Sequence, residues 1–467
     1  MVYWLSLVAV VALTITLVFR FKERALYFLF LVTYTQSFVI PFLYTNGVIG
    51  RDVARSMVLF KEFLLLELFV VSVVILFSRF RRPWPRPLRP LLFFTAYCIF
   101  RFVVGVVFLG DNLGQELFKL RMICYPLEIL MVVMVFTALK PEFGERFLRD
   151  ITYVLSILAV VAIALFLWAP ADFWLEHANI AAYDLEVKGE TDADLLPEKG
   201  ISLTSEGRAF FDFLSPFRAT GTFGDALTLG FSMAVPVLLL LFHFRKSLTS
   251  ALMLAASAGA MFFSLSRSVW LFCCIVGAYV LLRRRRYGLI LLLGVLALTP
   301  FLLWAPLADF AAYSISDLSR TNPGNEHAEG ILWFYSRGFT DSGNILGKGM
   351  ADEVQAIPES GYAFLLEHFG VLAYIAFLWF CISLYRQLRK DQSHTTSMPT
   401  LGQAITLGIF VVMHFSQYPF AFTEFISLWY IIGLCLSIYL LPRENHDHNP
   451  IGTNRQDLLG EILPSES

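Results

Sequence analysis

Residues 2–19 (VYWLSLVAVVALTITLVF) and residues 25–44 (ALYFLFLVTYTQSFVIPFLY) are two apolar stretches, separated by the basic residues Arg20, Lys22 and Arg24. A helix needs about 20 apolar residues to cross a bilayer, and it satisfies its own backbone hydrogen bonds in lipid. The two stretches therefore predict two membrane-spanning helices with a short basic connector. No small-residue cleavage site follows the first stretch, so we expect a retained helix and not a removed signal peptide.

The same pattern recurs along all 467 residues. The chain is 57% hydrophobic and 16% charged, whereas soluble domains carry about 25% charged residues. We therefore predict an all-α, polytopic transmembrane helix bundle of about 12–13 spans, forming one integral membrane domain over residues 1–467. This excludes a soluble globular enzyme, and the net charge of -1 gives no indication of nucleic-acid binding. The thirteen candidate spans are 2–19, 25–44, 62–78, 91–110, 121–139, 151–169, 223–244, 250–264, 268–282, 287–304, 361–385, 401–419 and 421–441.

The distribution of Lys and Arg predicts the orientation of the bundle. Alternate connectors, beginning with the one at 20–24, hold 22 of the 36 basic residues, and the opposite side holds 13. Basic residues in short loops mark the cytoplasmic side. The long loops at 170–217 and 305–358 then both fall on the periplasmic side, and the tail at 443–467 is cytoplasmic.

No pattern in the sequence indicates a metal, a disulfide framework or a nucleotide. All six cysteines fall inside apolar stretches without metal-ligand spacing. Phosphate-binding glycine loops and hydrolase motifs are not found. We therefore expect no cofactor and no metal site.

Arg218 lies in FRATGTFGD (residues 217–225), where the first long loop re-enters the membrane. Thr220 and Thr222 supply hydroxyls near the start of the next helix, whose N-terminus favours an anion. Gly221 lets the backbone approach a ligand closely. The alternative is an arginine that anchors the chain at the headgroups.

Arg267 in FSLSRSVWL (residues 263–271) is an isolated charge between apolar helices. Such a charge is expensive in a membrane and is a functional candidate. The alternative is a structural partner for a carboxylate such as Asp225 or Glu128. Another intramembrane arginine, Arg101, could pair with Glu128 from a neighbouring helix.

The second long loop adds further polar candidates. His327 is a possible general base, although a loop histidine is more often merely solvated. Glu359 and Ser360 open a transmembrane helix, where Ser is a usual N-cap and Glu is favoured by the helix dipole. Weaker candidates for substrate contact are Arg337, Ser360 and Tyr362.

In their order, these motifs resemble the O-antigen ligase/polymerase family, which joins WaaL-type ligases with Wzy-type polymerases. The similarity rests on FRATGTFGDALTLGFSMAVPV, SLSRS, LGKGM in the second loop and ESGYAFLLEHFGVLA. It covers about 215–385, and the preceding 200 residues only by hydropathy. Ligases of the family typically place His-Asn where this chain has Glu359 and Ser360, so the resemblance favours a polymerase.

The resemblance implies a multi-pass enzyme of the bacterial inner membrane that transfers glycan from undecaprenyl pyrophosphate to a growing lipid-linked glycan. Arg218 and Arg267 would bind the pyrophosphate, and His327 or Glu359 would orient or deprotonate the acceptor hydroxyl. Expected partners are the lipid-linked glycan, the bilayer, and a chain-length regulator and flippase of the same pathway. The alternatives are an O-antigen ligase or related transferase, and a flippase or other transporter of lipid-linked glycans.

Overall fold

The computed structural model describes residues 2–79, 85–109, 113–169, 173, 178, 183, 186, 187, 219–223, 225–244, 247–264, 266–285, 336, 339, 345–347, 360–390, 397–414, 418–420 and 422–440. Within this part of the chain every regular element is a helix. The α-helices are α1 (Val2–Phe21), α2 (Ala25–Thr45), α3 (Arg51–Val58), α4 (Phe60–Arg79), α5 (Leu88–Val104), α6 (Leu113–Leu139), α7 (Pro141–Trp168), α10 (Ala226–Phe242), α11 (Leu248–Phe263), α12 (Arg267–Arg283), α16 (Gly361–Phe369), α17 (Val371–Lys390), α18 (Ser397–Val412) and α19 (Phe422–Ser437). The all-α prediction is confirmed.

Among the residues that the structure describes, five helical segments are long and apolar enough to cross a membrane: Val2–Thr45, Leu88–Phe108, Lys119–Leu139, Pro141–Trp168 and Val371–Arg389. The structure places a helix at each predicted span except 287–304, which lies outside the described residues. Several of these helices, such as α11 and α18, have 16 residues and fall short of the length that a perpendicular span needs. The chain is therefore a multi-pass membrane protein, while a total of thirteen spans stays a prediction.

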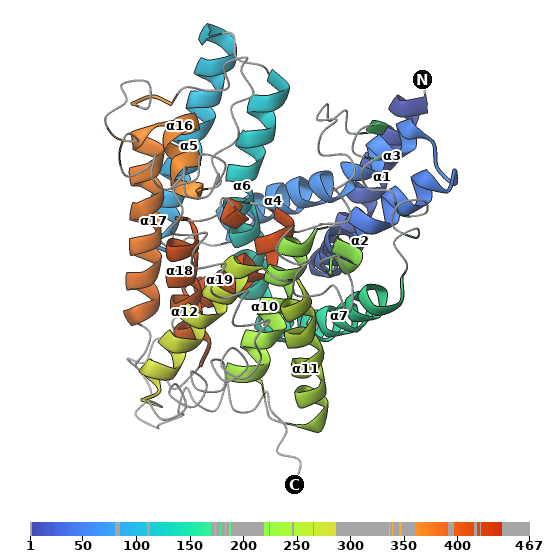
Figure 1. Ribbon diagram of the computed structural model, residues 1–467. Coiled ribbons are helices and arrows are strands. Elements are labelled where there is room, and N and C mark those ends of the chain that lie inside the picture. Colours follow the sequence, from blue (N-terminus) through green and yellow to red (C-terminus); the bar gives the residue numbers. More distant parts are fainter. Residues whose placement is uncertain are drawn as a thin grey trace.

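The core lies where α6, α10 and α19 meet, and α1 lies at the edge. Val132 on α6 and Ile431 on α19 are fully buried, and Figure 1 shows α5, α6 and α17 side by side, with α1 to α3 on the opposite flank. Trp4 and Val8 on α1 remain 67% and 65% exposed. Apolar side chains exposed in this way are matched to lipid, which is as apolar as they are.

One predicted span is wrong as a continuous helix. The stretch 361–385 divides at Gly370 into α16 and α17. Gly370 has φ +87° and ψ 177°, a conformation that is essentially restricted to glycine. The chain therefore turns a corner here, and α17 alone supplies the candidate span.

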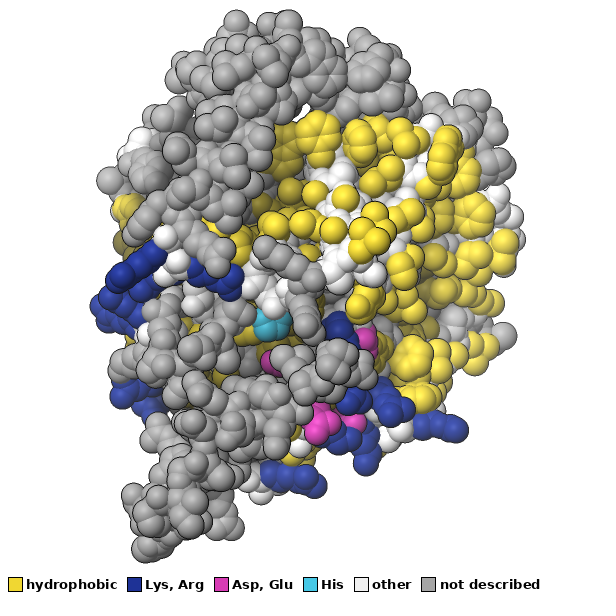
Figure 2. All heavy atoms as spheres, turned by 90° about the horizontal axis from the view of Figure 1, so that it is seen from below, with side chains coloured by type: hydrophobic (Ala, Val, Ile, Leu, Met, Phe, Trp, Pro, Cys, Tyr) yellow, Lys and Arg dark blue, Asp and Glu magenta, His cyan; other side chains and the backbone are white. Residues whose placement is uncertain are grey.

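Contacts between connectors agree with the predicted sides of the membrane. Lys140 pairs with Glu23, and the Arg284 Nη2 donates to the Phe242 carbonyl at 2.7 Å; these contacts join connectors predicted to be cytoplasmic. Figure 2, which views the molecule from the lower end of Figure 1, shows Lys and Arg side chains grouped on this face.

Contacts of the other set join segments predicted to be periplasmic. Arg55 Nε donates to the Val187 carbonyl at 2.7 Å, which attaches part of the first long loop to α3. Tyr183 packs on the same surface, against Ala54. The short helix α3, which the sequence treats as a plain connector, thus serves as a platform for that loop.

Topology can be measured by cysteine labelling. In a background in which the exposed native Cys274 is replaced by Ala, we expect Glu190→Cys and Arg320→Cys to react with a membrane-impermeant maleimide in intact cells. Gly460→Cys should react only after the cells are opened, because basic connectors retain the tail in the cytoplasm. Labelling of positions 190 and 320 from opposite sides would contradict a site shared by the two long loops.

Candidate functional site

The sequence-derived site residues are described to different extents. Arg218, His327, Arg337 and Glu359 lie outside the described residues. Arg267 is the first residue of α12, and its side chain is outside the described part. Ser360 and Tyr362 are described in full, and so are residues next to Arg218 and Arg267 in the chain.

Ser360 and Tyr362 attach the start of α16 to the end of α18. The Ser360 Oγ accepts from the Ala363 N–H at 3.4 Å, which confirms the predicted N-cap, and it donates to the Met413 carbonyl at 3.3 Å. The Tyr362 hydroxyl donates to the Phe410 carbonyl at 2.9 Å. Both side chains are buried, so the structure gives them an anchoring role.

His414 lies beside this attachment, immediately after Met413. Its ring centroid is 4.7 Å from that of Tyr362, at an interplanar angle of 62°, and the side chain is half-buried. No sequence pattern marks His414 as a candidate, because it stands inside the apolar stretch 401–419 and belongs to no motif.

The segments that carry Arg218 and Arg267 meet through their described neighbours. The Ala219 N–H donates to the Phe263 carbonyl, the last residue of α11, at 3.0 Å. At the start of α10 the chain supplies an anion of its own, because the Asp225 carboxylate caps that end and accepts from the Thr228 N–H at 2.9 Å. An anion already held by the chain satisfies the helix dipole there.

Helices α12 and α18 bring Arg267 and Met413 to the same end of the bundle. The Tyr279 hydroxyl donates to Gln403 Oε1 at 2.8 Å, and a Cβ on Gly408 would lie 2.6 Å from the Phe272 ring. The earlier residue of α12, Phe272, meets the later residue of α18, Gly408, and the later residue, Tyr279, meets the earlier one, Gln403. The two helices are therefore antiparallel. The start of α12 and the end of α18 lie together, and we call this the site end of the bundle.

The LGKGM segment docks at the corner between α16 and α17. Arg101 is 2% exposed; its Nε donates to the Leu346 carbonyl at 2.9 Å and its Nη2 to the Gly347 carbonyl at 3.0 Å. Gly347 and Gly370 contact each other through their backbones: a Cβ on Gly370 would lie 2.8 Å from the Gly347 nitrogen. The proposed pairing of Arg101 with Glu128 is therefore wrong, because the guanidinium is directed at loop carbonyls.

A buried polar cluster stands behind the same corner. Lys119 Nζ lies 3.3 Å from Glu116 Oε1 and 3.0 Å from His368 Nδ1, and both charged residues are 1% exposed. A buried charge is stable when it is paired and hydrogen-bonded. The cluster fixes α6 to α16, and no spacing rule on the sequence could have joined Lys119 to a histidine so far along the chain.

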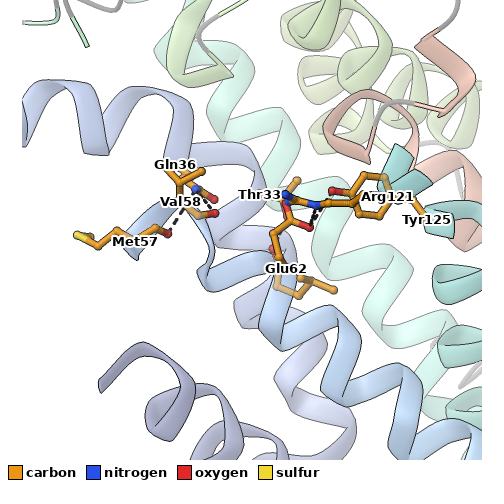
Figure 3. A network of polar contacts seen from close by, with 8 residues as sticks. Thr33, Gln36, Met57, Val58, Glu62, Arg121 and Tyr125 are labelled. Atoms are coloured by element: carbon orange, nitrogen blue, oxygen red, sulfur yellow. Dashed lines mark hydrogen bonds and ion pairs between the residues drawn. The ribbon is translucent and has the colours of Figure 1, made fainter. Parts of the chain in front are cut away.

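A second polar network links α4 to α6 (Figure 3). The Arg121 Nε donates to Glu62 Oε2 at 2.6 Å, and the Tyr125 hydroxyl donates to the same oxygen at 2.7 Å. Gln36 on α2 donates to the Val58 carbonyl at 2.9 Å. These hydrogen bonds join α6 to α4 and α2 to the end of α3, so the network holds neighbouring helices together.

The described residues hold no group of three or more His, Cys, Asp or Glu placed to bind a metal ion. What the site end offers instead is an imidazole, a helix start that carries an arginine, and two anchored loop segments. Comparisons with protein-family models, with curated proteins and with solved structures find no match.

Proposed function

We propose that this membrane protein is a polysaccharide polymerase that transfers glycan from undecaprenyl pyrophosphate to a growing lipid-linked glycan at the periplasmic face of the bacterial inner membrane. One observation carries the proposal: motif segments far apart in sequence are linked by contacts at one region of the bundle. Ala219 bonds to the SLSRS hairpin, that hairpin leads into α12 at the site end, and Ser360 bonds to α18 at the same end.

The LGKGM motif lies at the opposite end of α16 and connects to the site end through this helix. This helix has nine residues, so it spans about 14 Å between the site end and the corner that receives Gly347. A common site for all four motifs is what an enzyme acting on one lipid-linked substrate requires. Motif segments without contacts that link them would have argued against a common site.

The chemistry suits arginines. Transfer breaks the bond between the anomeric carbon and a phosphate oxygen, and the leaving diphosphate carries negative charge. Guanidinium groups bind phosphates through two parallel hydrogen bonds, which is the role proposed for Arg218 and Arg267. The acceptor hydroxyl loses its proton as it attacks, so a proton acceptor is required as well.

Analysis of the glycans in a strain lacking this protein tests the proposal. We expect single repeat units on the final acceptor and no long chains, with polymer restored by the wild-type gene. Long chains retained on undecaprenyl pyrophosphate would identify a ligase instead. Repeat units trapped on the cytoplasmic side would identify a flippase, and an unchanged glycan profile would contradict all three functions.

A further inference from the structure

The proposed transfer needs a proton acceptor close to the acceptor sugar. The sequence offers His327 and Glu359 for this role, and both come from the second long loop. The described structure adds an imidazole from a different element, the end of α18. Its position can be judged from contacts with the start of α16 and with α18 itself.

His414 lies where these segments meet. Met413, its neighbour, accepts hydrogen bonds from the Ser360 hydroxyl and from the Tyr362 N–H, each at 3.3 Å. The His414 ring packs edge-on against Tyr362 at 4.7 Å and against Phe410 at 6.0 Å. These rigid contacts hold the imidazole at the site end, next to the chain that enters α16 and on the helix that pairs with α12.

The His414 ring is half-buried, beside the residues that open α16. A neutral imidazole accepts a proton on its unprotonated ring nitrogen. His368, by contrast, is 7% exposed and bonded to Lys119, and belongs to the buried cluster.

We infer that His414 is a catalytic base that accepts the proton of the attacking sugar hydroxyl. The inference rests on the proposed function. The hydroxyl oxygen forms a bond to the anomeric carbon as its proton passes to a ring nitrogen of His414. The bond from that carbon to the phosphate oxygen breaks, and the diphosphate leaves with the electron pair. His414 then returns its proton to solvent.

The chain contains a matched control. His243 follows α10 at the end of the bundle where Arg284 contacts Phe242, and it is half-buried like His414. Unlike His414, it does not lie at the site end, where the transfer is proposed to take place.

The experiment uses the full chain in lipid nanodiscs and the lipid-linked repeat unit isolated from the deletion strain. We expect His414→Gln to lower kcat by about 10²–10⁴-fold, the usual contribution of a general base, with KM little changed. His243→Gln should retain the wild-type rate. Wild-type kcat should fall as the pH drops through the pKa of His414, and this acid limb should vanish in His414→Gln. Tyr362 is a described titratable group that packs against the ring, and its hydroxyl donates to the Phe410 carbonyl.

Each outcome decides between the two claims. If the wild-type protein polymerises and His414→Gln is equally fast, the base assignment is wrong and the proposed function stands. If the wild-type protein forms no polymer from this substrate, the proposed function fails first. Should His414→Gln be missing from the membrane, His414→Asn and the wild-type acid limb decide, and a wild-type rate independent of pH on the acid side overturns the assignment.

Discussion

Replacing Arg218 or Arg267 with alanine is expected to abolish polymer formation while the protein remains in the membrane. Each guanidinium is proposed to hold charge on the leaving diphosphate as the anomeric bond breaks. The loss of one preorganised electrostatic contact of this kind typically costs about 10²–10³ in rate. Lysine keeps the charge but loses the two-pronged geometry, so we expect the lysine variants to retain partial activity at best.

Polymer length in cells and turnover in nanodiscs both measure this effect at matched expression. Arg51→Ala is the control, because Arg51 is an exposed arginine at the start of α3 on the same predicted side. Its removal should leave polymer formation normal. Normal polymer in both Arg218→Ala and Arg267→Ala would refute the pyrophosphate mechanism even if the protein proved to be a polymerase.

Gly370→Ala is expected to destabilise the fold strongly. A non-glycine residue at φ +87° and ψ 177° is strained by about 1–3 kcal/mol. The new Cβ would also lie 2.6 Å from the Ile345 carbonyl oxygen, and overpacking adds typically about 1–3 kcal/mol. We expect a lower unfolding midpoint in a detergent titration and little protein in the membrane.

Two further variants test the reason for this effect. Gly277→Ala on α12 is the control, because its Cβ would meet nothing closer than 3.9 Å and alanine favours a helix; its stability should be unchanged or higher. Gly347→Ala disturbs the same backbone contact from the loop side. The loss of stability in the double variant with Gly370→Ala should therefore not exceed the sum of the losses in the two single variants. Wild-type stability in Gly370→Ala would contradict the corner described here.

The sequence predicts helix positions well because membrane insertion depends on hydropathy over about 20 residues. It misses the corner at Gly370, because an apolar run of this length reads the same whether the backbone is straight or turned by a single glycine. The sequence also misses the target of Arg101. That target is a pair of carbonyls, and carbonyls are present at every residue and leave no pattern.

The candidate site was predicted in part for a similar reason. The N-cap at Ser360 depends on local chemistry and is confirmed. Contacts such as Ala219 with Phe263 and Ser360 with Met413 join motifs through tertiary packing, which local patterns do not encode. His414 carries no motif of its own, and it becomes a candidate through what surrounds it.

The buried contacts of Arg101 and Lys119 constrain how the protein is made. Arg101 bonds to residues 245 and 246 positions later, and Lys119 contacts a residue 249 positions later. When the ribosome has delivered α5 and α6 to the insertion machinery, these distant partners have not yet been synthesised, and of the contacts described here only the one between Lys119 and Glu116 within α6 can form. An arginine at the centre of a lone span costs about 2.5–3.5 kcal/mol, and Arg101 lies inside the candidate span Leu88–Phe108. Lys119 is the first residue of the candidate span Lys119–Leu139, where a lysine can extend to the headgroups at a lower cost. The two helices must be retained beside the insertase, or held with their charges near the headgroups, until translation passes residue 368. Assembly of this half of the bundle is therefore a late event, completed after the last partner helix arrives.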